Sequence, residues 1–178
     1  LFGIGFVLAP FVAVVVRGLE ADLARLLADP AVHRAAITSI VIATTAALLA
    51  MAVSLAVVLA TEALRNAPAL GNGLVTTASL VLVVPPIVVG AGWFLALRQV
   101  TDVFAAAPYV VVATNAAMAV PFIVRIVGPA LAAANQATGR LADSLGLAGL
   151  SRLRVVDWPV LRAPVALGFA FALAISLG

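Results

Sequence analysis

The chain has 178 residues, of which 65% are hydrophobic and 10% charged, and its mean hydropathy is +1.27. A soluble domain typically has about 45–50% apolar and about 25% charged residues, so the composition excludes an ordinary soluble enzyme and a disordered chain. The ten basic residues are all Arg and are spread along the chain, for a net charge of +3, so no nucleic-acid-binding stripe is expected. The chain has no cysteine, which excludes disulfide and thiolate chemistry. An integral membrane protein remains.

Stretches without charged residues divide the chain into candidate membrane spans. Three central stretches without a charged residue are 27, 32 and 22 residues long, and a spanning helix needs about 20 residues. Backbone groups in lipid must be satisfied internally, and the stretches are too long for barrel strands, so helices are predicted. The chain is expected to be one all-α, polytopic helix bundle, truncated at both ends. The predicted spans are near 1–17, 36–60, 74–97, 107–127 and 164–178.

The connections between the spans predict their orientation. Segment 18–35 has the pattern of a short amphipathic helix at the membrane surface, ended by the Asp29-Pro30 step. Arg is enriched on the cytoplasmic side of membrane proteins. If 61–73 and 128–163 lie in the cytoplasm, six Arg are on the inner side, counting Arg125 at the end of its span, and four are on the outer side. The 36-residue segment 128–163 is therefore predicted to be a long cytoplasmic loop.

This cytoplasmic loop is predicted to contain two short helices. The first covers about 131–145 and ends at Gly146, because glycine is favoured just after a helix C-terminus. The second starts near Ser151, a good N-cap residue, and ends at Pro159. Such a pair would dock a soluble partner, although a plain amphipathic surface helix fits the periodicity as well. Two Arg of the second helix are expected to face water, where they either meet acidic partner side chains or only mark the cytoplasmic side: Arg152 and Arg154.

Few residues inside the spans are candidates for contact with a solute. Pro85 and Pro86 lie in mid-span and would kink the helix, so that freed carbonyls line a path, or the kink is purely structural. Asn115 is strongly polar and deep in its span, and an interhelical hydrogen bond is favoured over contact with a solute. Small residues are predicted to let helices approach closely at 90–92 and at Gly168. No catalytic site, metal site or cofactor is predicted, since no metal-ligand motif surrounds the single histidine.

The loop sequence resembles the conserved cytoplasmic loop of binding-protein-dependent ABC importer permeases. The family pattern is Glu-Ala-Ala, three residues, Gly, nine residues and Ile-x-Leu-Pro. Aligned on Gly146, it places Arg140-Leu141-Ala142 at the triplet and Val156-Asp-Trp-Pro159 at the end, although Arg140 and Leu141 replace Glu and Ala. Residues 79–178 are similar to the C-terminal half of thiamine importer permeases. The stretches that carry this similarity are 84–97, 114–122, 144–156 and 170–178.

The resemblance implies a type I importer permease that moves thiamine or its phosphates across the bacterial inner membrane and is not itself an enzyme. It also implies that the last span of this permease half is missing from the chain. The implied partners are a separate ABC ATPase subunit, a periplasmic substrate-binding protein, a second permease half and membrane lipid, but no nucleic acid. ATP-driven closure of the ATPase would move the loop and switch the path between its two states. The residues expected to couple the loop to the ATPase are Arg140, Leu141, Ala142, Asp143, Gly146, Ser151, Arg152, Arg154, Val156 and Pro159. The candidate path residues are Pro85, Pro86 and Asn115.

Three other functions remain open at this point. A permease for ferric iron or another small solute would share the same architecture. An intramembrane enzyme would need convergent ionisable or nucleophilic groups, which the predicted spans lack. A non-transporting membrane scaffold would have no need for the spacing between Gly146 and Pro159.

Overall fold

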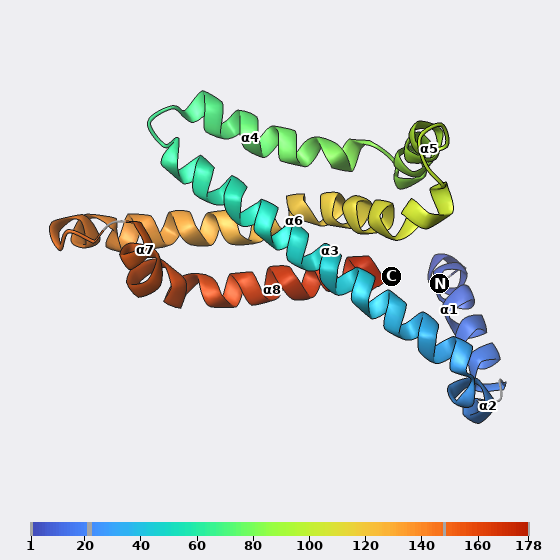
Figure 1. The fold of residues 1–178 in the computed structure, drawn as a ribbon. Helices are drawn as coiled ribbons and strands as arrows, with labels where there is room; N and C mark the ends of the chain where they lie inside the picture. The colour runs from blue at the N-terminus through green and yellow to red at the C-terminus, as the bar shows by residue number, and fades with distance from the viewer. Residues whose placement is uncertain (1, 21–22, 148, 178) are drawn as a thin grey trace. The chain divides into compact units, whose positions relative to one another are not determined.

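The computed structural model describes residues 2–20, 23–147 and 149–177. Within these ranges, the side chains at positions 2–7, 19, 20, 23, 24, 26, 86, 140, 141, 143 and 150 lie outside the description. All elements of the described part are helical (Figure 1), which confirms the all-α prediction. They are α1 (Phe2–Glu20), α2 (Leu23–Ala28), α3 (Pro30–Ala63), α4 (Pro68–Leu80), the 3-10 helix η1 (Val81–Val83), α5 (Pro86–Leu97), α6 (Val103–Ser144), α7 (Gly149–Arg152), the π-helical turn η2 (Leu153–Asp157) and α8 (Trp158–Leu177).

Three of these helices are long and apolar enough to cross a membrane, and a bent pair formed by 68–83 and 87–97 would make a fourth. The chain divides into two compact units, residues 1–39 and 40–178. The first unit holds α1, α2 and the first turns of α3. Asp29 caps α3, because its Oδ1 accepts a hydrogen bond of 2.7 Å from the Ala31 backbone N–H. Pro30 occupies the first helical position, where its missing N–H costs nothing.

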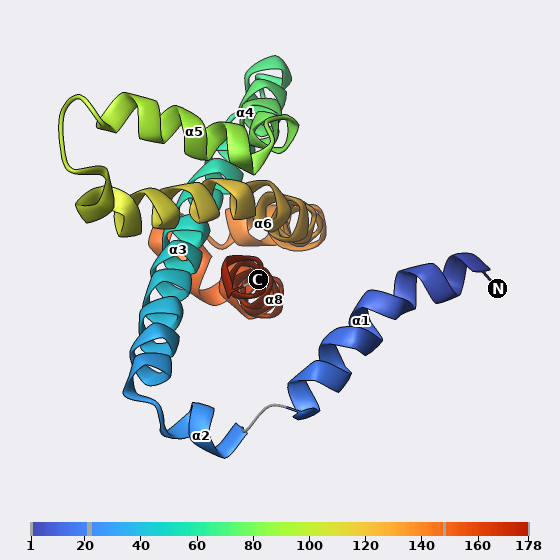
Figure 2. The same cartoon turned by 90° about the vertical axis from the view of Figure 1, so that its right-hand side faces the viewer.

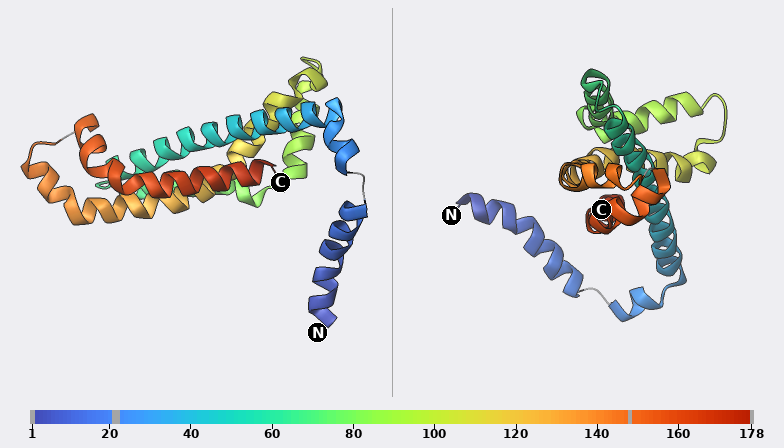
Figure 3. Two further views of the ribbon diagram at one scale, coloured as in Figure 1. Left: turned by 90° about the horizontal axis from the view of Figure 1, so that it is seen from below. Right: turned by 90° about the vertical axis from the view of Figure 1, so that its left-hand side faces the viewer.

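The core of the second unit lies where α3, α6 and α8 pack together, as the ribbon views indicate (Figures 1 and 3). Small residues of α3 allow the close approach, and Ile123 and Val127 of α6 are fully buried against them. Gly168 of α8 lies at the contact of all three helices. A Cβ at this position would lie 3.3 Å from Cγ2 of Ile123 and 3.5 Å from Cε of Met51. The predicted close approach of helices at Gly168 is therefore confirmed.

Two polar contacts join these helices. The buried Ser54 hydroxyl of α3 donates to the Val120 carbonyl of α6 at 3.3 Å. Asn115 of α6 donates from Nδ2 to Oγ of Ser176 in α8 at 2.9 Å. The interhelical hydrogen bond favoured for Asn115 is thus present, and it uses the amide donor within the bundle.

Replacing Asn115 with leucine is expected to lower the stability of the bundle moderately. Hydrogen bonds between membrane helices contribute about 0.6 kcal/mol on average and at most about 1.7 kcal/mol. Thermal unfolding in detergent micelles measures the effect. Thr45→Val is the control, because the Thr45 hydroxyl bonds to the Val41 carbonyl of its own helix. Equal melting temperatures for the two variants would contradict the interhelical role of Asn115.

The predicted span 74–97 is not one kinked helix. It is divided into α4 with η1 and then α5, whose axes differ by 90°, and Figure 2 shows α5 running across the view above the first part of α6 rather than continuing along α4. The cause is the Pro85-Pro86 pair, because a residue before proline is driven out of the helical region. Val84 has φ −92° and ψ 120°, and Pro85 has ψ 138°. The close approach predicted at 90–92 is also not found, since no described atom outside the local helix backbone lies within 4 Å of a Cβ built at Gly90 or Gly92.

Candidate functional site

The candidate site begins with the length of α6, a single helix of 42 residues. The sequence predicts a span over 107–127 followed by a separate loop helix over 131–145, but the structure joins them into one. A 42-residue helix is about 63 Å long at 1.5 Å per residue, roughly twice the thickness of the hydrocarbon core. The helix continues through its internal prolines, as membrane helices tolerate when neighbours compensate the freed carbonyls. The first half of the loop is therefore continuous with a core helix.

The end of α6 forms a helix C-terminal cap at Gly146. Gly146 has φ +68°, the left-handed conformation that glycine adopts without a steric penalty. The Leu147 N–H donates to the Ala142 carbonyl at 3.0 Å, which is the six-to-one hydrogen bond of a Schellman motif. The predicted helix end at Gly146 is confirmed. Ala142 is buried at this end of α6.

The second half of the loop differs from the prediction. It begins at Gly149, so Ser151 lies inside α7 rather than at its N-cap, and it does not end at Pro159. The π-helical turn η2 connects α7 to α8, with the Trp158 N–H donating to the Leu153 carbonyl five residues earlier. This wider turn stands just before Pro159, whose missing N–H is then tolerated in the first turn of α8. Figure 1 shows α7 turned away from the axis of α8.

The two arginines predicted in the second loop helix have different environments. The Arg154 side chain is exposed, as predicted. Arg152 was expected to face water, but its side chain is only 24% exposed and turns back onto α6. Its Nη2 donates to Oδ1 of Asn135 at 2.5 Å, and its Nε lies 3.9 Å from Oδ2 of Asp157. The absence of a side chain at Gly139 leaves room for it, since a Cβ there would be 3.6 Å from Nη2.

The other candidate residues are distributed along the loop and the spans. Ser151 and Pro159 are exposed and Val156 is half-buried, so the loop presents a mixed surface. Pro85 is exposed at the break before α5. The side chains of Arg140, Leu141, Asp143 and Pro86 lie outside the described residues.

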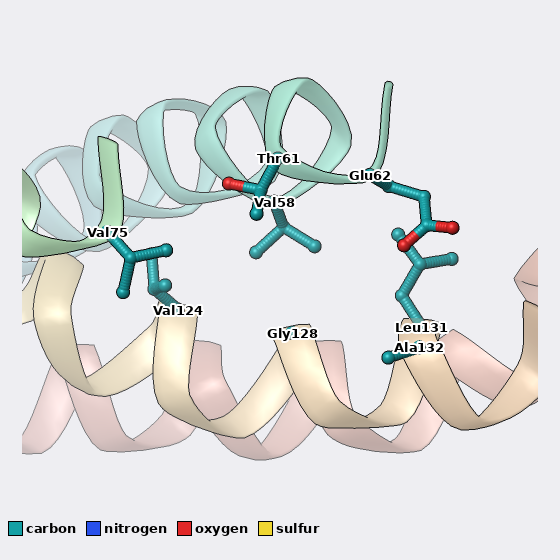
Figure 4. Close-up of a pocket in the computed structure, with 8 residues that line it drawn as sticks. All are labelled: Val58, Thr61, Glu62, Val75, Val124, Gly128, Leu131 and Ala132. Carbon is teal, nitrogen blue, oxygen red and sulfur yellow. The ribbon is translucent and has the colours of Figure 1, made fainter. Parts of the chain in front are cut away.

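Sequence reasoning did not find a hollow of about 210 Å³ between α3, α4 and α6. Figure 4 shows the Glu62 side chain directed into the space between α3 and α6, above Leu131. Its Oε1 lies 3.4 Å from Nη1 of Arg65, which offsets its charge. The sequence feature that could have indicated this hollow is Gly128, because a glycine leaves the floor of the hollow without a side chain. The lining residues are Val58, Thr61, Glu62, Val75, Val124, Gly128, Leu131 and Ala132.

Replacing Gly128 with alanine is expected to raise stability by about 0.5–1 kcal/mol, because alanine is the better helix former and its methyl group enters the hollow. The space is available, since a Cβ at Gly128 would lie 4.0 Å from Cγ2 of Val58. The melting temperature in detergent checks the change. A lower melting temperature for Gly128→Ala would show that the hollow cannot accept the added methyl group.

No family model and no solved structure matches the chain. Its sequence is similar to curated proteins called thiamine transport system permease protein ThiP. The protein from Brucella abortus (strain 2308) is 51% identical over 176 residues, which are 99% of this chain and 32% of the relative. Those from Salmonella typhimurium and Escherichia coli (strain K12) are 34% and 32% identical over 173 residues, 96% of this chain and 32% of each relative. The chain thus spans about a third of the length of the relatives it matches.

The relatives are permease proteins, and the part of the chain that the structure describes has three helices, or four with the bent pair, that are long and apolar enough to cross a membrane. The chain is a multi-pass membrane protein. The resemblance to thiamine importer permeases is confirmed, and the chain is homologous, over nearly its whole length, to about a third of the thiamine transport system permease proteins.

Proposed function

We propose that this chain forms part of the transmembrane permease of an ABC importer that moves thiamine across the bacterial inner membrane. The observation that carries the proposal is 51% identity over 176 residues to a thiamine transport permease. The segment from Arg140 to Pro159, which carries the loop motif, agrees with this proposal, because the segment connects two helices of the core, α6 and α8. Residues 1–178 belong to one permease domain in this proposal. The orientation follows the arginine distribution, with the loop in the cytoplasm.

The partners follow from this role. A separate ATPase subunit hydrolyses ATP, a periplasmic binding protein delivers the solute, and a second permease half completes the path. The chain itself makes and breaks no covalent bond. Its coupling loop, residues 140–159, contacts the ATPase, and nucleotide binding there shifts the permease between two conformations.

The structure supports a mechanical account of this coupling. Because α6 continues from the core to Ser144 without a break, displacement of its cytoplasmic end moves the core directly. The loop returns through α7 and η2 into α8, which packs against α6. A force on the loop is therefore transmitted to two packed helices, α6 and α8, and does not pass through a flexible linker.

Transport into proteoliposomes tests the proposal. The permease containing this chain is reconstituted with its ATPase and its binding protein, and labelled thiamine is supplied outside with ferric iron as competitor. ATP-dependent accumulation of thiamine that ferric iron does not inhibit is expected. Accumulation of ferric iron or another solute without thiamine would overturn the substrate assignment. If no solute moves and the ATPase does not co-purify, the chain is a membrane scaffold rather than an importer permease.

A further inference from the structure

The side chain of Arg152 connects three points of the coupling loop. It starts at the end of α7 and reaches Asn135 on α6, where Nη2 donates to Oδ1 at 2.5 Å. Its Nε lies 3.9 Å from Oδ2 of Asp157, at the far end of the π-helical turn. The guanidinium passes over Gly139, one helical turn beyond Asn135. One side chain therefore links the end of α7 to α6 and to the far end of η2.

Burial makes this contact selective for arginine. Asn135 is 8% exposed and Asp157 is 6% exposed. A buried carboxylate is unfavourable unless it is paired, and Arg152 is the cation that a described contact places beside Asp157. The planar guanidinium presents several donors in fixed directions, so that one side chain can donate a hydrogen bond to the amide oxygen of Asn135 and pair with the carboxylate of Asp157.

The surroundings indicate that this contact also lies near α3. The pair faces a hollow of about 250 Å³ that Glu62, in the last turn of α3, and Arg65, just after that helix, also line. Oδ1 of Asp157 is buried and has no hydrogen-bond partner among the described atoms. Loss of Arg152 would therefore remove the cation that the described ion pair places beside this buried carboxylate.

We propose that Arg152 is a positioning residue that fixes the angle between α7 and α6, so that movement of the loop is transmitted to the core helices. This inference rests on the proposed coupling function of the loop. Arg152 acts through Asn135 and Asp157 rather than by contact with the ATPase or the solute. The exposed Arg154, two residues further on, has no such contact with α6 among the described residues, and it remains available to a partner.

The geometry of the loop is tested by spin-label distances in the reconstituted transporter. This chain contains no cysteine, so it adds no competing thiol to the exposed positions Gln136→Cys on α6 and Val155→Cys in η2. A narrow distance distribution is expected with Arg152 present, and a broad one in Arg152→Gln. Arg154→Gln is the matched control and keeps the narrow distribution. An unchanged distribution in Arg152→Gln overturns the proposal, whatever transport shows.

Coupling is then measured as thiamine molecules transported per ATP hydrolysed. In Arg152→Gln this ratio is expected to fall at least tenfold while the ATPase still co-purifies, and in Arg162→Gln, which alters an exposed arginine of α8 outside the coupling loop, it stays within twofold of the unaltered protein. A ratio as high in Arg152→Gln as in Arg162→Gln overturns the proposal. If the unaltered protein moves no thiamine, the proposed function fails, while the distance measurement still decides whether Arg152 fixes the loop.

Two further variants approach the contact from α6. Gly139→Leu places side-chain atoms where the guanidinium lies, without altering Arg152, and is expected to reproduce the broad distribution. Asn135→Asp retains an acceptor for Arg152 and is expected to keep the narrow distance distribution. Asn135→Leu removes the acceptor and is expected to give the broad distribution. If Gly139→Leu and Asn135→Leu both behave like the unaltered protein, the contact with α6 does not position the loop.

Discussion

Replacing Gly146 with valine is expected to abolish coupled thiamine uptake, with at least a tenfold loss. Gly146 adopts φ +68°, and a β-branched residue held in such a conformation costs of the order of 1–3 kcal/mol. The variant would escape this strain by unwinding the end of α6, which breaks the hydrogen bond from the Leu147 N–H to the Ala142 carbonyl. The loop would then leave α6 in another direction and lose its position on the ATPase. Uptake into proteoliposomes with ATP hydrolysis measured in parallel checks the result.

The control for this experiment is Gly146→Asn. Asparagine is the residue besides glycine that most readily adopts the left-handed conformation, so uptake should remain within a few-fold of the original. A general intolerance of any side chain at this position would instead abolish uptake in both variants. The space around Gly146 argues against such intolerance, because no described atom beyond the neighbouring residues lies within 4 Å of a Cβ built there. Full uptake in Gly146→Val would contradict the requirement for the helix cap.

The features that the sequence predicted correctly depend on local chemistry. Gly146 ends a helix because its backbone adopts a conformation unfavourable to other residues, and that preference belongs to the residue itself. Gly168 allows close packing because it has no side chain, which also needs no knowledge of its neighbours. The interhelical bond of Asn115 was expected because a lone amide within an apolar span needs a partner. Its partner Ser176, 61 residues away, was not identified.

The features that the sequence missed depend on distant contacts or on backbone compensation. The sequence predicts Arg152 in water, because the partner of a lone arginine cannot be identified from sequence alone. In the structure its guanidinium donates a hydrogen bond to Asn135, which lies 17 residues earlier in the chain. The sequence predicts a helix end at Pro159, but the π-helical turn before it lets the chain continue into α8. The sequence does contain a signal for the break at Pro85, because each of two successive prolines forces the residue before it into an extended conformation.

Replacing Gly168 with leucine is expected to be the most destabilising of the substitutions considered. The first added carbon would lie 3.3 Å from Cγ2 of Ile123 and 3.5 Å from Cε of Met51, and Ile123 is fully buried. Three more carbons would have to enter a close-packed junction of three helices, and overpacking of this kind costs typically about 1–3 kcal/mol and occasionally more. The melting temperature in detergent should fall by many degrees, and uptake should fall with it.

The graded variant Gly168→Ala separates crowding from a general effect of replacing glycine in a helix. Its single methyl group requires Ile123 to move by only a few tenths of an ångström, so a smaller loss of stability is expected. Gly92→Leu is the matched control, because a Cβ there has no described atom outside its local helix backbone within 4 Å. Leucine is also the better helix former, so this control should melt no lower than the unaltered protein. If Gly168→Leu melted like Gly92→Leu, then α3, α6 and α8 would not pack as closely at this junction as the distances require.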